Sequence, residues 1–457
     1  MSMRKIYNSK INEFSIQFYL FSIVFFFIIN VCSLFSFNSA YQFSKIFTLS
    51  FVIILIIRSF RKNGIISIYS LFISFCLFFL YLRIFFDLIG YKSLANYTFG
   101  THRTWSDKIL FSFLNYSFLY LLTIDFFYYM EKPKRIHFVG VIQNNTSKRI
   151  IYCFFLLFTL IFLYKCYLDI QAIHKLGYTS TVSNVRINYP IWTVGAGTFF
   201  YIFFYLLLMH KLSKKETVGV FIIYAIVSLL SGLKGARAAF FVPIIFSLFY
   251  LSEKKYIKVT FPKLIILIIV AMSLIFLITF SRGEDLSYVE SLKDIFCYVF
   301  YNQTQTFNVP IFYLEYKDIC KEHRFIPFIF SDVLHYYIAT LPSGGSTINN
   351  FTGLPNGMGL GNSLFLELLD LPLILAFFAC FCIAKAIKFV QYNFLRNRKL
   401  LPLFCCFVSS AFYMPRNTLF SFLDPSSVIY LIASNVFLII FLFFAKYSFN
   451  AGTQKNE

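Results

Sequence analysis

The chain has 457 residues, of which 59% are hydrophobic and only 13% are charged, and its mean hydropathy is +0.71. An average soluble domain has roughly 45–50% apolar and about 25% charged residues, so this chain cannot cover a water-facing surface, and a cytosolic globular enzyme is excluded. The net charge of +21 would suit nucleic acid, but the basic residues stand in short clusters between apolar runs. That arrangement is typical of membrane topology, and we expect no nucleic-acid partner.

Long apolar runs recur along the chain. A bilayer core of ~30 Å needs about 20 apolar residues per helix, so these runs predict about twelve transmembrane helices. They fall near residues 14–36, 43–57, 65–88, 109–130, 150–170, 190–209, 217–233, 238–252, 263–281, 371–390, 401–423 and 427–445. The second and eighth are the shortest. The first run is too long for a cleavable signal peptide and lacks a small-residue cleavage site.

The basic residues predict the orientation. With the N-terminus in the cytoplasm, most of the 41 Lys and Arg fall on the cytoplasmic side, as the positive-inside rule requires. Trp105 and Trp192 then fall at the outer interface, where amphipathic rings are favoured. We therefore expect an all-α polytopic integral membrane protein, a single transmembrane domain over residues 1–457, with both termini cytoplasmic and an even number of spans.

One outer loop, about 282–370, is far longer than the others and holds half of the acidic residues. Residues 291–317 and 325–341 are amphipathic enough for short helices that lie on the membrane. Residues 342–361 are rich in Gly and predict irregular backbone. Because long loops with structure of their own are usually functional, we expect the active site at this large periplasmic loop.

Cysteine usage predicts no disulfide framework. All but two of the ten Cys lie in apolar runs, where free Cys behaves as a small hydrophobe. Cys297 and Cys320 reach the outer loop, where a disulfide and two free thiols are both open. No His lies near the C-x-C at Cys380 or near the adjacent Cys405 and Cys406, and no D-x-D pair lies on an outer loop. We therefore expect neither a metal site nor a cofactor.

Cationic side chains are predicted at the outer face, where the positive-inside rule disfavours them. Lys234 and Arg237 lie in the tight turn SGLKGARAAFF, Arg282 lies where the ninth span emerges, and Arg416 follows Pro415 inside an apolar run. Each could instead pair with an acid or extend to the interface. Together they favour an anion site, and a diphosphate at the outer leaflet suits it because Arg donates two parallel hydrogen bonds to phosphate.

Acidic residues and histidine give a weaker signal. Glu367, where the long loop re-enters the bilayer, and His335 could each remove a proton from a sugar hydroxyl. Alternatively, His335 is an interfacial histidine and Glu367 pairs with one of the arginines. Arg83 and Asp87, four residues apart in the third run, are expected to pair, whereas the buried Asp125 has no identified partner.

Several short motifs resemble the Wzy-type O-antigen polymerases. The segment LSGLKGARAAFFVPIIFSLFYLSEKKYIK resembles the hallmark basic turn and following span of that family. FSRGEDLSYVESLKDIF, IATLPSG and GMGLGNSLFLELLDLP follow in the family's order. The resemblance covers roughly residues 215–425.

The resemblance implies an oligosaccharide repeat unit polymerase in the bacterial inner membrane. Such enzymes transfer a chain from undecaprenyl diphosphate onto the non-reducing end of another lipid-linked unit at the periplasmic face, without metal or nucleotide sugar. A flippase and a chain-length regulator of the same pathway are implied partners, and a GT-C-like fold is implied. Whether the polymer is O-antigen, capsule or exopolysaccharide stays open.

The resemblance also implies roles for single residues. Arg237, Arg282 and Arg416 fall on the family's basic positions and would neutralise the departing diphosphate, together with Lys234 of the same turn. Glu367 falls on its acidic position, with a base or orienting role. The turn after Pro342 is Ser-Gly-Gly rather than basic, which is a departure from the pattern.

Two other functions compete with the polymerase. An O-antigen ligase has a similar topology and would depend on His335 while tolerating the loss of Arg237. A flippase for the same lipid-linked unit would keep its charges within the helix bundle and lack one dominant outer loop.

Overall fold

The computed structural model describes residues 3–89, 106–130, 136, 144–176, 189–233, 237–281, 304–318, 327–330, 337 and 363–453. In these residues the regular structure is helical, with no strand. The helices on the N-terminal side are α1 (Met3–Phe35), α2 (Phe37–Asn63), α3 (Ile68–Cys76), η1 (Leu77–Tyr81), α4 (Leu82–Leu88), α6 (Asp107–Met130) and α7 (Asn145–Leu176). The central ones are η2 (Ile191–Thr193), α9 (Ala196–Met209), α10 (Lys214–Leu233), α11 (Arg237–Glu253) and α12 (Phe261–Ser281). The remaining ones are η3 (Thr304–Phe307), α14 (Asn308–Glu315), α18 (Leu364–Asp370), α19 (Leu373–Asn393), α20 (Leu401–Tyr413), η4 (Met414–Arg416), η5 (Ser421–Leu423) and α21 (Pro425–Thr453).

Each apolar run predicted as a span coincides with a helix or with consecutive helices. In the described part of the chain, nine helices are long and apolar enough to cross a membrane, which confirms an all-α polytopic membrane protein. The second run is longer than predicted, because α2 extends over 27 residues. The eighth is indeed short, at 17 residues in α11. The total of twelve spans stays a prediction.

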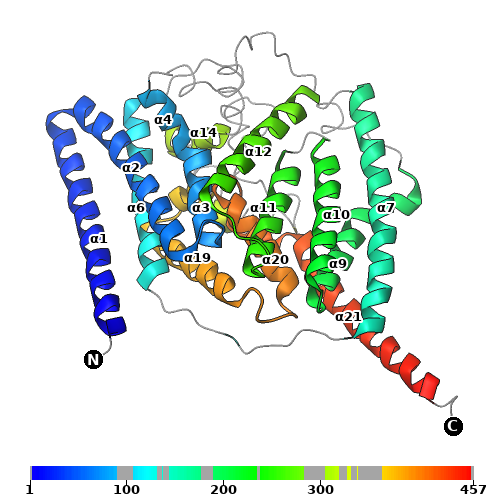
Figure 1. Ribbon diagram of the computed structural model, residues 1–457. Coiled ribbons are helices and arrows are strands. Elements are labelled where there is room, and N and C mark those ends of the chain that lie inside the picture. The colour runs from blue at the N-terminus through cyan, green and yellow to red at the C-terminus, as the bar shows by residue number, and fades with distance from the viewer. Residues whose placement is uncertain are drawn as a thin grey trace.

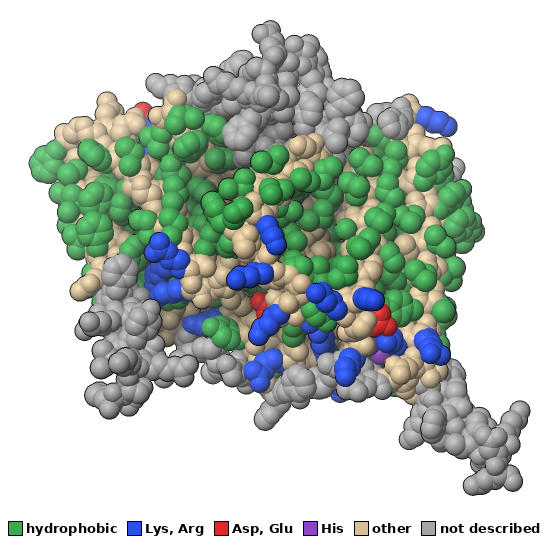
Figure 2. Space-filling model, in the orientation of Figure 1, with side chains coloured by type: hydrophobic (Ala, Val, Ile, Leu, Met, Phe, Trp, Pro, Cys, Tyr) green, Lys and Arg blue, Asp and Glu red, His purple; other side chains and the backbone are tan. Residues whose placement is uncertain are grey.

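The long helices stand side by side across one layer, and the start of α1 and the end of α21 lie at the same end of it (Figure 1). On the face drawn in Figure 2, hydrophobic side chains form a broad band, and Lys and Arg gather at that same end. Hydrophobic side chains in this layer are widely exposed, for example Leu34 and Ile374 at 82% each, as a lipid-facing surface requires. We call the opposite end, where α4 and α14 lie (Figure 1), the outer end.

Aromatic rings fill the interior. Phe204 of α9 stacks on Tyr224 of α10 with ring centroids 4.3 Å apart, and Phe113 of α6 meets Phe307 of η3 edge to face. Because lipid is as apolar as these side chains, helices associate in a membrane through close packing rather than through the hydrophobic effect. The abundant Phe therefore serves shape complementarity between helices.

Gly232 belongs to the basic turn sequence SGLKGARAAFF, in which glycine could allow a sharp turn and a close approach to a ligand. It lies inside α10, and a Cβ at this position would come within 2.6 Å of Cβ of Phe240 in α11. The glycine therefore allows α10 and α11 to pack closely against each other. Its role in the described structure is helix packing rather than ligand approach.

The long loop enters the bundle. Within the predicted amphipathic segment 291–317, the helix α14 has buried residues over Asn308–Tyr313 and packs against α6 and α18. The expectation of a helix lying on the membrane is therefore wrong for α14, because Val309, Ile311 and Phe312 are all covered by protein. The described part of this loop contributes to the core of the outer end.

Candidate functional site

Two of the six predicted site residues have described side chains, Glu367 and Arg416. Lys234, Arg282 and His335 lie outside the described residues, as do Cys297 and Cys320. Arg237 is the first residue of α11, and its side chain is likewise outside them.

Arg416 lies in a chain reversal that Pro415 helps to produce. Proline lacks a backbone N–H and kinks or breaks a helix, and here α20 ends at Tyr413, two residues before Pro415, and gives way to the 3-10 turn η4. We call residues 414–424, between α20 and α21, the 414–424 turn. Ser363, the residue before α18, donates its hydroxyl to the carbonyl oxygen of Pro415 at 2.9 Å. A backbone carbonyl in the turn thereby gains the partner that a membrane interior demands.

The guanidinium of Arg416 packs on aromatic rings. Its central carbon lies 5.6 Å from the ring centroid of Phe79 and 5.9 Å from that of Tyr413. The two rings contact each other edge to face. A cation over ring faces is stabilised by the ring quadrupole, so these contacts hold the planar group in one orientation.

Phe79 comes from an unusual element. It lies in η1, a π-helix that interrupts the third span between α3 and α4. Such π-helical turns are rare in proteins, but those that occur often lie at functional sites. Here the π-helix supplies the ring against which Arg416 packs.

Glu367 is fully buried on α18, one turn after Ser363. Its Oε2 accepts the backbone N–H of Leu419 at 2.8 Å. The bonds from Ser363 to Pro415 and from Leu419 to Glu367 thus fasten α18 to the 414–424 turn on both sides of Arg416. The structure therefore joins Glu367 to the turn that carries Arg416, with Leu419 as a described partner of the carboxylate.

Asp370, three residues further on α18, was not among the predicted site residues. Its carboxylate accepts the Tyr313 hydroxyl of α14 and the backbone N–H of Phe328, each at 2.8 Å. The same short helix therefore holds the 414–424 turn through Glu367 and the long loop through Asp370. The spacing of two acids at i and i+3 within LFLELLD was a signal that could have indicated this double role.

A second polar region lies at the outer end of the N-terminal helices. A cavity of about 250 Å³ is lined by side chains that include Lys45, Arg83, Asp87, Asp107 and Phe307. The expected pair of Arg83 with Asp87 is not what the described residues show. Nζ of Lys45 lies 2.6 Å from Asp87, and Nη1 of Arg83 donates to Oδ1 of Asn308 at 2.9 Å. Packing of α2 against α4 thus replaces a local pair with a long-range one.

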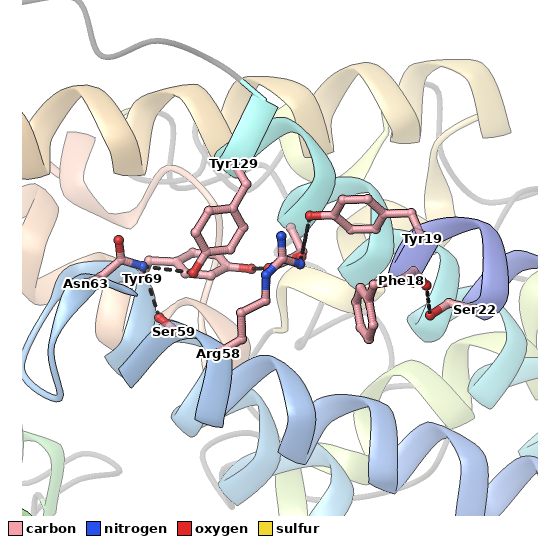
Figure 3. A network of polar contacts seen from close by, with 9 residues as sticks. Phe18, Tyr19, Ser22, Arg58, Ser59, Asn63, Tyr69 and Tyr129 are labelled. Atoms are coloured by element: carbon pink, nitrogen blue, oxygen red, sulfur yellow. Dashed lines mark hydrogen bonds and ion pairs between the residues drawn. The ribbon is translucent and has the colours of Figure 1, made fainter. Parts of the chain in front are cut away.

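Asp125 is partnered by a network nearer the ends of the helices where Lys and Arg gather. Arg58 lies 2.7 Å from its Oδ2, and the hydroxyls of Tyr19 and Tyr69 donate to its two oxygens (Figure 3). The guanidinium also lies 4.2 Å from the ring centroid of Tyr129. A buried carboxylate is tolerated when it is paired and hydrogen-bonded in this way, so this network joins α1, α2, α3 and α6.

One comparison with known proteins gives a match. A family profile described as O-antigen polysaccharide polymerase Wzy matches residues 18–450 of the chain. Neither a curated protein nor a solved structure matches. The matched range includes the N-terminal helices, which the short sequence motifs left uncovered.

Proposed function

Because the chain belongs to the O-antigen polysaccharide polymerase Wzy family and is a multi-pass protein of the bacterial inner membrane, we propose that it polymerises its lipid-linked repeat units by a glycosyl transfer with the lipid diphosphate as leaving group. A hydroxyl oxygen of the acceptor sugar attacks the anomeric carbon of the donor. The bond from that carbon to the diphosphate oxygen breaks, and the lipid diphosphate leaves with the electron pair. The acceptor's proton passes to a base.

The observation that carries this proposal is the fixed position of Arg416. Charge develops on the diphosphate as it departs, and a pre-positioned cation in a water-poor site stabilises that charge strongly. Arg416 meets this requirement because two hydrogen bonds to α18 and two aromatic rings fix its turn. We propose that Lys234, Arg237 and Arg282 complete the diphosphate site.

For Glu367 the geometry favours a positioning role. Its carboxylate accepts a backbone N–H of the turn that carries Arg416, which is the contact of a group that orients its neighbour. His335 is kept as the candidate base, on sequence grounds. We also propose undecaprenyl diphosphate as the carrier, residues 282–370 as the periplasmic loop, and a flippase and a chain-length regulator as pathway partners.

The experiment is complementation of a strain that lacks the polymerase, followed by electrophoresis of its lipopolysaccharide. We expect Arg416→Ala to leave lipid A core with a single repeat, because loss of one charge-stabilising group typically costs roughly 10²–10³ in rate. Arg416→Lys keeps a charge without the planar fork and should restore short chains. Arg61→Ala, an exposed arginine at the far end of α2, is the control and should give full-length ladders.

Full-length ladders from Arg416→Ala at normal protein levels would overturn the proposed diphosphate site. A ligase would give a different pattern, in which His335→Ala abolishes transfer to lipid A core and Arg237→Ala is tolerated.

A further inference from the structure

The cavity at the outer ends of α2, α4 and α6 is separate from the turn that carries Arg416. Its charged lining consists of two cations, Lys45 and Arg83, and two carboxylates, Asp87 and Asp107. Lys45 and Arg83 are almost fully buried, at 5% and 1% exposure. Ionisable groups inside a membrane protein are costly and usually mark a functional path or site.

The balance of charges indicates what kind of ligand fits. A diphosphate would meet the two carboxylates at short range and be repelled. A neutral polyhydroxylated ligand fits better, because every hydroxyl both donates and accepts hydrogen bonds. The cations and Tyr41 can donate, the carboxylates can accept, and Phe113 and Leu114 supply apolar walls. This mixture of apolar walls with a few convergent polar groups is typical of small-molecule sites.

The size of the cavity narrows the ligand further. Ligand pockets usually measure roughly 300–1,000 Å³, and this one measures about 250 Å³. It therefore has room for about one sugar ring rather than for an oligosaccharide. The terminal sugar of a chain is such a ring.

Direct packing joins the cavity to the Arg416 site. Phe79, the ring under Arg416, precedes Arg83 of the cavity by four residues on the same span. Phe113 of the cavity wall contacts Phe365, which lies on α18 two residues before Glu367. A sugar in the cavity would thus lie beside the elements that hold the proposed diphosphate site.

We propose that this cavity is the acceptor subsite, which binds the neutral non-reducing-end sugar of the lipid-linked unit that receives the chain. The inference rests on the proposed glycosyl transfer, because an enzyme that joins two units needs a site for the acceptor sugar as well as one for the donor. Lys45, Asp87 and Arg83 hold the sugar's hydroxyls, and the apolar wall packs against the ring.

The test replaces the ion pair with apolar side chains of similar size, Lys45→Met with Asp87→Leu. Exchanging a buried ion pair for packed apolar residues is often neutral for stability, so the variant should fold. The probe acceptor is the repeat-unit oligosaccharide converted to an octyl glycoside, which has no diphosphate and can act only as acceptor. Transfer from the lipid-linked unit to this probe is measured with the purified full chain in lipid nanodiscs.

We expect the double variant to raise the half-saturating concentration of the octyl glycoside at least about tenfold, as when a site loses hydrogen bonds to a substrate hydroxyl. The half-saturating concentration of the lipid-linked donor should not change. The matched control is Lys148→Met with Glu216→Gln. These two residues form an ion pair between α7 and α10, and neither helix supplies a residue to the lining of the cavity. Glu216→Gln retains a side-chain oxygen that can accept the Ser213 N–H, and its own backbone N–H can still donate to the Ser213 hydroxyl, as in a capping box.

An unchanged half-saturation for the octyl glycoside in the double variant would overturn the acceptor subsite. Failure of the proposed diphosphate site would give a different result, because Arg416→Ala would then transfer from the lipid-linked donor at the normal rate. If the double variant raised the half-saturating concentration of the octyl glycoside while Arg416→Ala transferred normally, the acceptor subsite would be supported and the diphosphate site would be overturned.

Discussion

Asp125 and Arg416 are charged side chains inside this helix layer that occupy different kinds of environment. Asp125 accepts hydrogen bonds from Tyr19 and Tyr69 and pairs with Arg58 within one compact network. Arg416 instead packs on the rings of Phe79 and Tyr413 in a turn between helices. The Asp125 network links helices to one another, and we assign it to stability, while we assign Arg416 to chemistry.

The role of Asp125 predicts a loss of stability without a specific loss of transfer. Asp125→Asn would leave the charge of Arg58 without its carboxylate and should cost about 3 kcal/mol. Tyr69→Phe removes one hydrogen bond to the carboxylate and should cost about 1.5–3 kcal/mol. Thermal unfolding of the detergent-purified protein measures both changes. Transfer activity per folded molecule should stay near normal, and a selective loss of activity would contradict a structural role.

A histidine at the other end of α9 from the outer site predicts a pH dependence of stability. Burial lowers the pKa of His210 below its usual value of 6.5, and this effect, together with the charge of Lys148, outweighs the hydrogen bond to the Leu206 carbonyl, which raises the pKa. The folded state therefore favours the neutral ring, whose nitrogens lie near the Ser147 hydroxyl and the Leu206 carbonyl.

As the pH falls, the unfolded state takes up the proton before the folded state does. The stabilisation from the neutral ring is therefore fully present above about pH 6.5 and is lost as the pH falls through the lowered pKa of the folded state. The melting temperature should fall between about pH 7 and pH 5. His210→Gln should show a smaller fall over the same range, and an equal fall in both proteins would contradict this assignment.

At the scale of elements, α18 is the piece that assembles the site. This seven-residue helix is buried throughout and holds the 414–424 turn through Glu367 and the long loop through Asp370. Its N-terminal neighbour Ser363 adds a second bond to the turn. Through these cross-connections the short helix joins the 414–424 turn to the described part of the long loop.

Glu367 offers a test that separates positioning from proton transfer. Glu367→Gln retains a carbonyl oxygen that can accept the Leu419 N–H, so a positioning residue should keep most of the polymer ladder. Glu367→Ala removes the acceptor and leaves a buried N–H without it, which typically costs about 1–3 kcal/mol, and should shorten or abolish the chains. If Glu367 were the general base, the Gln variant would be as inactive as the Ala variant.

Hydropathy predicted the helices because each span buries its own backbone bonds and needs nothing from its neighbours. Contacts between spans were less accessible to sequence reasoning. The i,i+4 spacing of Arg83 and Asp87 predicted a local pair, yet the partner of Asp87 is Lys45 on another helix. Similarly, the sequence indicated Arg416 as part of an anion site and Glu367 as a candidate base or orienting residue, but their junction through Leu419 depends on how α18 meets the turn.

Across the whole molecule, charge is distributed unevenly between the two ends of the helix layer. Lys and Arg gather at the end where α1 begins and α21 finishes, and a hydrophobic band fills the middle (Figures 1 and 2). In a bilayer, the basic end is expected to face the cytoplasm. The outer end, with α4, α14 and α18, would then face the compartment in which lipid-linked units are polymerised.

This orientation predicts the behaviour of reporter fusions. Alkaline phosphatase needs disulfides, which form in the periplasm and not in the cytoplasm. A fusion within the long loop, after Gly345, should therefore be active, whereas fusions after Lys258 and after the last residue, Glu457, should be inactive. A fluorescent protein fused after Glu457 should show the reverse, because it matures in the cytoplasm. Phosphatase activity at Glu457 would mean an odd number of spans. The 414–424 turn, one span before the C-terminus, would then lie on the cytoplasmic side, whereas the polymerase reaction requires it on the periplasmic side.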